Sequence, residues 1–153
     1  MPDIELGQAV LYVRDLLRSR HFYTEVLGFA VRVELTAGGR PVGLALTSGR
    51  SHHELLLIEV GFDAEPVAST RRVGLAHLGC KIGDDDDALR TMHARLVAAD
   101  VEVLGMVDRG VTHGLALADP DGNELELYVE VVDPQVWRRR PDLLVHPPRP
   151  LVL

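Results

Sequence analysis

The sequence contains an internal repeat, and this repeat constrains the fold more than any other feature of the chain. Three segments recur in the same order at nearly one offset, which is 71 residues for two of the pairs and 69 for the third. The matched pairs are residues 8–15 with 77–84, 43–46 with 114–117, and 53–56 with 124–127. A repeated order of this kind indicates two copies of one structural module. We place the first module at residues 4–61 and the second at residues 73–131, with a polar link at 62–72.

Each module has the pattern of a strand, a helix and three further strands. In the first module we expect strands at 8–13, 29–35, 42–47 and 53–60, with a helix that starts at Asp15 or Ser19 and stops at Gly28. In the second we expect strands at 76–82, 101–107, 114–118 and 124–131, with a helix that begins in the acidic run 84–87. Residues 119–123, Asp-Pro-Asp-Gly-Asn, predict a hairpin turn before the last strand. The predicted fold class is therefore α+β.

Composition and charge argue against several classes of protein. A hydrophobic fraction of 46% is enough for a packed core, and a net charge of -7 argues against a nucleic-acid partner. The one cysteine, Cys80, allows no disulfide within the chain and no zinc–thiolate cluster. No apolar run is long enough to cross a bilayer, and residues 1–7 lack the pattern of a signal peptide. We therefore expect a cytoplasmic protein with no membrane partner.

Alternation along the strands places polar residues of the repeat on one face. Glu126 and Tyr128 lie two residues apart and therefore share a face of the last strand. The offset of 71 places Leu55 at the position of Glu126, and the offset of 69 places Gln8 at the position of His77. Gln8, His77 and Glu126 can each donate a lone pair to a metal ion. The repeat by itself thus selects a candidate metal site.

Four segments carry a resemblance to a known family; they are residues 13–16, 22–29, 52–55 and 119–127. Together they resemble the vicinal oxygen chelate superfamily, which includes glyoxalases, extradiol dioxygenases, bleomycin-type resistance proteins and fosfomycin-resistance enzymes. The resemblance implies a glyoxalase-like fold, in which two tandem βαβββ modules form a cup-shaped mixed or antiparallel sheet. It predicts a single domain at residues 1–132, followed by a Pro- and Arg-rich tail at 133–153.

The resemblance also implies a site for a divalent metal ion. Fe(II) is the favoured metal, and Mn, Zn and Ni are the alternatives. By their positions in the family's motifs, the ligands here would be Gln8, His77 and Glu126.

The same comparison suggests which residues would act on a substrate. His53 matches a histidine that transfers a proton beside the metal in single-domain extradiol dioxygenases, and alternation puts it on the face of Leu55. His113 lies near a loop where some members carry a substrate-contacting histidine, so we include it as a catalytic candidate. Tyr128 shares the face of Glu126 and either contacts the substrate or packs.

Three positions depart from the family pattern. Gln8 stands where the dioxygenases have a histidine ligand, Ala116 stands where many have a tyrosine, and Leu55 removes a carboxylate of the glyoxalases. Three functions therefore stay open: an oxidoreductase that cleaves a small catecholic aromatic, a glyoxalase, epimerase or lyase, and a non-catalytic protein that binds an antibiotic. In each case the partner is a small molecule. We expect a homodimer, and the cup would close either within one chain or across two.

The tail at 133–153 differs in composition from both modules. It holds five prolines, Trp137 and three consecutive arginines, Arg138 to Arg140. The prolines argue against a regular helix or a central strand along its length. We expect the tail to wrap its own domain or a second subunit, with binding of an anion as the alternative.

Overall fold

The computed structural model describes residues 3–68 and 73–153, and it divides into two compact units, residues 1–67 and 68–153. Each unit contains one βαβββ module. Part of the link predicted at 62–72 falls on residues 69–72, which lie outside the described residues. Within the described ranges, no helix is both long and apolar enough to cross a membrane.

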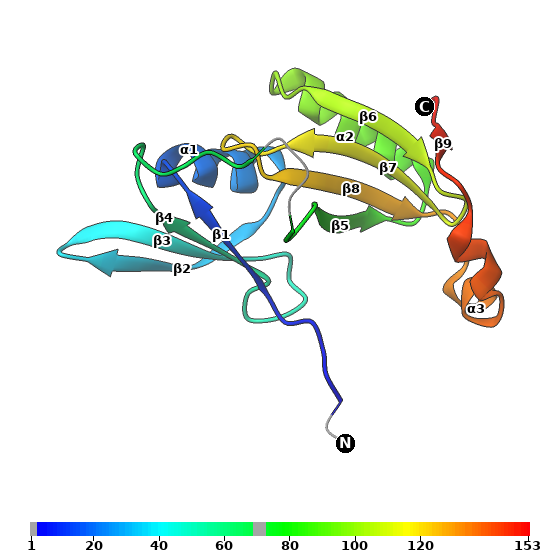
Figure 1. Cartoon of the computed structure of the whole chain (residues 1–153), viewed down its shortest axis with the longest axis horizontal. Helices are drawn as coiled ribbons and strands as arrows, with labels where there is room; N and C mark the ends of the chain where they lie inside the picture. The colour runs from blue at the N-terminus through cyan, green and yellow to red at the C-terminus, as the bar shows by residue number, and fades with distance from the viewer. Residues whose placement is uncertain (1–2, 69–72) are drawn as a thin grey trace. The chain divides into compact units, whose positions relative to one another are not determined.

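The first unit is a four-stranded sheet with one helical segment (Figure 1). Its elements are β1 (Ala9–Val13), α1 (Leu16–His21), a π-helical turn (Phe22–Val26), β2 (Ala30–Ala37), β3 (Arg40–Thr47) and β4 (Leu55–Glu59). The strand order in the sheet is β1-β4-β3-β2. β1 runs parallel to β4, and the other neighbouring strands are antiparallel, so the sheet is mixed.

The helical segment of this unit begins and ends at residues suited to those positions. The Asp15 carboxylate accepts a hydrogen bond from the Arg18 backbone N–H at 2.9 Å and caps the first turn. Gly28 adopts a φ of 90°, a conformation that ends a helix and that glycine tolerates best. The helix predicted between Asp15 and Gly28 is confirmed, and its last part, Phe22–Val26, is π-helical.

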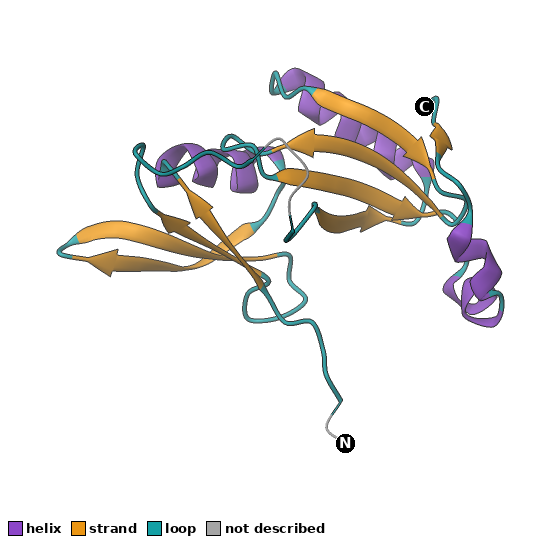
Figure 2. Ribbon diagram, in the orientation of Figure 1, coloured by secondary structure: helices purple, strands orange, loops and turns teal. Residues whose placement is uncertain are grey.

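The second unit is a five-stranded sheet with the order β5-β8-β7-β6-β9. Figure 2 shows its strands in orange and its helices in purple. Its strands are β5 (Leu78–Gly83), β6 (Val103–Asp108), β7 (Thr112–Ala118), β8 (Glu124–Glu130) and β9 (Arg149–Pro150). Its helices are α2 (Asp86–Ala98), α3 (Pro134–Arg139) and a 3₁₀ turn (Pro141–Val145). β5 runs parallel to β8, as β1 runs parallel to β4. The α+β class and the two βαβββ modules predicted from the repeat are confirmed.

Helix α2 covers one face of the second sheet. Asp85 caps its start by accepting a hydrogen bond from the Ala88 backbone N–H at 2.9 Å. Leu89 and Leu96 on the helix are fully buried, as is Leu127 on the sheet. This burial removes the apolar face of β8 from water and leaves the other face of the strand, which carries Glu126, open.

The turn between β7 and β8 is held by a buried carboxylate. Asp119 is 5% exposed and accepts hydrogen bonds from the Asp121 backbone N–H at 2.9 Å and the Asn123 backbone N–H at 2.8 Å. It also accepts one from the Asn123 side-chain amide at 2.9 Å. Gly122 has a φ of 89°. The predicted hairpin turn is confirmed, and it sets where β8 begins.

The strand registers correct one position of the repeat. Ala116 pairs with Glu126 in the second unit, and the corresponding Ala45 pairs with Leu56 in the first. Leu56, not Leu55, is therefore the counterpart of Glu126, while Leu55 is buried on the helix side. The prediction for Leu55 was wrong because the connection between β3 and β4 is one residue longer than that between β7 and β8. A shift of one residue exchanges the two faces of a strand.

The tail folds back onto the second unit. β9 pairs antiparallel with β6, with Arg149 opposite Asp108 and Pro150 opposite Val107. The Leu151 backbone N–H donates to the Met106 carbonyl at 3.1 Å. The tail thus contains a short helix and a two-residue edge strand, where proline is tolerated because an edge strand needs fewer backbone donors.

Candidate metal site

His77 and Glu126 lie together on the second unit. His77 directly precedes β5, and Glu126 lies in β8 opposite Gly79 of β5. The His77 Nε2 and Glu126 Oε2 atoms are 3.1 Å apart. The His77 side chain is 43% exposed and that of Glu126 is 16% exposed, so the pair is reached from solvent on the imidazole side.

Arg109 holds the other oxygen of the same carboxylate. Its Nε donates a hydrogen bond to Glu126 Oε1 at 3.1 Å from the short connection between β6 and β7. Arg109 was not among the predicted site residues, because nothing in the local pattern shows that a side chain of this connection reaches Glu126. The one signal available in the sequence was Arg109 itself, a positively charged residue in a short connection of a chain whose net charge is negative.

Gly114 provides the space into which the Glu126 side chain bends. A β-carbon added at Gly114 would lie 2.8 Å from Glu126 Oε1 and 3.2 Å from its Cγ, closer than side chains pack. The glycine of β7 therefore allows the carboxylate to lie flat over the neighbouring strand. In this position Glu126 reaches both His77 and Arg109.

The donor atoms of the pair fit a divalent metal ion. Two ligands at right angles, each about 2.1 Å from a metal, lie about 3 Å apart. The 3.1 Å between His77 Nε2 and Glu126 Oε2 is compatible with this separation, and it is also the length of a direct hydrogen bond between the two side chains. In residues 3–68 and 73–153, no three His, Cys, Asp or Glu side chains gather closely enough to hold a metal together. A complete site on this pair therefore needs a donor of another type or from outside this unit.

Gln8 belongs to the first unit, at the position equivalent to His77. It directly precedes β1, whose first residue Ala9 pairs with Leu55, just as Leu78 pairs with Leu125. Its side chain is exposed. The equivalence predicted for Gln8 and His77 thus holds in the strand registers.

His53 precedes β4 and is not part of it. Its Nδ1 lies 2.6 Å from Nδ1 of His52, so the two imidazoles share one hydrogen at this contact. Alternation along β4 therefore does not place His53 on the face of Leu55. The direction of the His53 side chain is therefore set by the connection before β4 and not by the strand.

Glu54 anchors the connection that carries the two histidines. Slight burial raises the pKa of its carboxyl, but hydrogen bonds from the Ser48 backbone, from Ser51 and from Thr47 outweigh this and lower the pKa from 4.5 to about 2. The Ser48 backbone N–H donates at 2.7 Å. Glu54 therefore stays ionised throughout the range in which proteins function.

Glu54→Gln is expected to reduce the acid sensitivity of the fold. A carboxyl whose pKa is lowered on folding stabilises the folded state above about pH 4.5, and this contribution is lost as the pH falls toward 2. The variant should lose about 1 kcal/mol at pH 7, since solvent competes for these exposed hydrogen bonds. Chemical unfolding at pH 7, 5 and 3 measures the free energy of unfolding at each pH, and thus both the loss at pH 7 and the acid sensitivity. If the free energy of unfolding falls equally steeply below pH 5 in the variant and in the unmodified protein, the expectation is contradicted.

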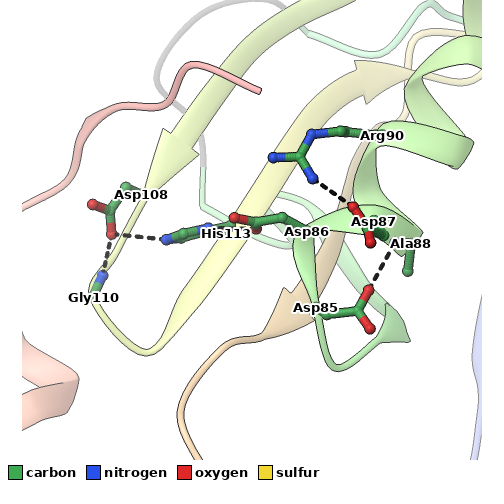
Figure 3. Close-up of polar contacts among 8 residues, drawn as sticks. All are labelled: Asp85, Asp86, Asp87, Ala88, Arg90, Asp108, Gly110 and His113. Atoms are coloured by element: carbon green, nitrogen blue, oxygen red, sulfur yellow. Dashed lines mark hydrogen bonds and ion pairs between the residues drawn. The ribbon is translucent and has the colours of Figure 1, made fainter.

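His113 lies on the face of the second sheet opposite Glu126. Figure 3 shows its side chain between those of Asp86 and Asp108. Its Nδ1 is 2.6 Å from Asp86 Oδ1 of α2, and its Nε2 is 3.6 Å from Asp108 Oδ1 of β6. Strand β7 begins at Thr112, so His113 alternates with Gly114 and shares the helix side with Leu115. The structure therefore does not bring His113 to the His77–Glu126 pair.

Tyr128 shares the open face of β8 with Glu126. Its ring lies against β5, because a β-carbon added at Gly79 would be 3.5 Å from Tyr128 Cε1. Burial raises the pKa of the Tyr128 hydroxyl, and the Glu130 carboxylate adds to this effect. Tyr128 is therefore a protonated, half-buried aromatic side chain two residues along the strand from the pair.

A protein-family model covers most of the chain. The model described as the Glyoxalase/Bleomycin resistance protein/Dioxygenase superfamily matches residues 5–127. This range contains Gln8, His77 and Glu126.

Two curated relatives are similar to the chain. Catechol-2,3-dioxygenase of Bacillus subtilis (strain 168) is 33% identical over 134 residues, which are 84% of this chain and 42% of the relative. Biphenyl-2,3-diol 1,2-dioxygenase 3 of Rhodococcus globerulus is 30% identical over 125 residues, which are 82% of this chain and 63% of the relative. The chain therefore spans less than two thirds of the length of either relative.

Solved structures show the same fold. A glyoxylase/bleomycin resistance protein/dioxygenase domain from Frankia sp. EAN1pec has a TM-score of 0.69 and 22% identity, covering 84% of this chain and 93% of that one. A glyoxalase/dioxygenase from Nostoc punctiforme has a TM-score of 0.68 and 18% identity, covering 84% and 92%.

Proposed function

Because the chain belongs to the glyoxalase/bleomycin resistance protein/dioxygenase superfamily, we propose that it is a metal-dependent enzyme that cleaves the ring of small catecholic aromatics. The observation that carries this proposal is the His77–Glu126 pair, whose donor atoms lie 3.1 Å apart on the open face of the second unit. The similarity to a catechol and a biphenyl-diol dioxygenase supports a diol as substrate.

Gln8, His77 and Glu126 are the residues proposed to hold the metal, with Fe(II) favoured. Their donors are an amide oxygen, an imidazole nitrogen and a carboxylate oxygen, a set that suits Fe(II) or Mn(II) and leaves positions open for other ligands. When bound, a divalent ion supplies Lewis acidity toward two neighbouring substrate oxygens. Arg109 donates a hydrogen bond to Glu126 Oε1, so Oε2 is the carboxylate oxygen that would bind the metal.

His53 and Tyr128 are the residues proposed to act on the diol. His53 has a ring nitrogen free of its contact with His52 and can accept a hydroxyl proton. Tyr128 offers an aromatic face beside Glu126. The position of His113 between α2 and β6 gives it no part in this proposal.

A second candidate function is binding of a small molecule without catalysis. Leu56 occupies the position in the first unit that corresponds to Glu126, and Ala116 offers no hydroxyl beside it. The leucine also argues against a glyoxalase type of site, which uses a carboxylate from each module. A protein that only sequesters its ligand would tolerate both residues.

Metal analysis together with O₂ uptake tests the proposal. Protein purified without chelator should contain about one metal ion per site and should consume O₂ when catechol is added. His77→Ala should lose the metal, while the matched variant His21→Ala, in an exposed position of the first unit, should keep it. Absence of metal at any loading, with ligand affinity unchanged in His77→Ala, would contradict the enzyme and favour the binding protein.

A further inference from the structure

Arg109 has donors that its contact with Glu126 does not use. Its Nε binds Glu126 Oε1, and its side chain is 41% exposed. Within residues 3–68 and 73–153, Glu126 is the acidic side chain that pairs with it, and its two terminal nitrogens face no other carboxylate. A guanidinium offers five N–H donors in a planar fork, so an edge suited to a second carboxylate stays available.

The main chain that carries Arg109 is held on both sides. The Arg109 backbone N–H donates to the Thr112 carbonyl at 2.9 Å, and the Asp108 carboxylate accepts from the Gly110 backbone N–H at 2.6 Å. His113 lies between Asp108 and Asp86 and ties this connection to α2 (Figure 3). An arginine on a fixed backbone loses less freedom when it binds a ligand, and this favours selective recognition.

The charges at the proposed site do not cancel. Glu126 is its one anionic donor, because Gln8 is an amide and a coordinating imidazole is neutral. A divalent ion with this set keeps a positive charge, and Arg109 adds another beside it. A catechol that gives up one hydroxyl proton on binding would offset one of these two positive charges, and a carboxylate substituent would offset the other.

We propose that Arg109 selects catechols that carry a carboxylate substituent, by binding that carboxylate with the edge of its guanidinium that faces away from Glu126. The inference rests on the proposed function, since it assumes that a diol binds beside His77 and Glu126. In this role Arg109 determines substrate specificity, and its contact with Glu126 fixes the direction of the guanidinium.

Ligand binding measured without turnover tests the inference. Calorimetry on the metal-containing protein under anaerobic conditions compares 3,4-dihydroxybenzoate with 4-methylcatechol, which has a similar size and no charge. The unmodified protein should bind the carboxylate at least about 10-fold more tightly, as expected for a charge-assisted hydrogen bond. Because Arg109 also holds Glu126 Oε1, Arg109→Gln is expected to weaken binding of both catechols. With the protein saturated with metal, the loss for 3,4-dihydroxybenzoate should exceed the loss for 4-methylcatechol by about 10-fold or more. Arg109→Lys keeps the positive charge but lacks the planar fork of donors. Its affinity for 3,4-dihydroxybenzoate should lie between those of the unmodified protein and Arg109→Gln.

Arg90→Gln is the matched control. Arg90 pairs with Asp87 on α2, so its loss removes an exposed Arg–Asp contact from the same unit. The control should leave both affinities unchanged. The inference is overturned if Arg109→Gln weakens the affinity for both catechols equally. It is also overturned if the unmodified protein binds 3,4-dihydroxybenzoate no more tightly than 4-methylcatechol.

The same samples separate this inference from the proposed function. Selective binding of the carboxylate without O₂ uptake would leave the selectivity of Arg109 standing and would refute ring cleavage. O₂ uptake with both catechols at equal affinity would support ring cleavage and refute the selectivity. If neither catechol binds, both are refuted.

Discussion

Glu126→Gln should lower the affinity of the protein for a divalent metal by at least about 100-fold. The substitution keeps the size of the side chain and an oxygen that can accept from Arg109, but it removes the one negative charge from the proposed donor set. Loss even of residues that only orient a metal ligand costs 10- to 100-fold, so loss of the charged ligand itself should cost no less. Competition with a chromophoric chelator measures the affinity directly.

Glu124→Gln is the control for this experiment. Glu124 lies on the same face of β8, two residues before Glu126, and is exposed. Its substitution removes an equal charge from the same strand without touching His77 or Arg109. Metal affinity that falls equally in both variants would show that the general charge of the strand matters and that Glu126 is not a ligand.

Asp119→Ala should destabilise the second unit by about 3 kcal/mol. The substitution removes an acceptor that is 5% exposed and leaves the Asn123 backbone N–H, 2.8 Å from it, without that partner. Hydrogen bonds to charged groups contribute about 1.5–3 kcal/mol, and a buried donor left unpaired costs about 1–3 kcal/mol. Urea unfolding followed by circular dichroism measures the loss.

Asp119→Asn separates the charge from the geometry of this turn. Its amide oxygen can still accept from the Asp121 and Asn123 backbones, but its NH₂ group faces the Asn123 side-chain amide. We expect a loss of about 1 kcal/mol. If Asp119→Ala is as stable as the unmodified chain, the turn does not depend on this carboxylate.

The fold was predictable because its signals are local and repeated. Asp15 and Gly28 mark the ends of the first helical segment by their own conformational preferences, and the hairpin at Asp119 has its typical composition. The equivalence of Gln8 and His77 followed from comparing two strands that begin in the same way. These features need no knowledge of what lies across the sheet.

The errors arose where contacts depend on the length of a connection. One extra residue before β4 moved Leu55 to the core and put Leu56 opposite Ala45. Strand β7 starts at Thr112, two residues earlier than predicted, so His113 lies within the strand and contacts Asp86 of α2. The contact between Arg109 and Glu126 joins side chains 17 positions apart and depends on the path of a short connection, which no periodicity reveals.

The short strand β9 pairs with β6, which would otherwise be the outer strand of the second sheet. An outer strand with free backbone N–H and C=O groups is a template to which another chain can add, and proteins protect such strands to stay in solution. Arg149, Pro150 and Leu151 cover part of the outer side of β6. Pro150 lacks an N–H, so the covering segment is itself a poor template for a further strand. Residues 149–151 thus take up part of the outer edge of β6 that another chain could otherwise pair with.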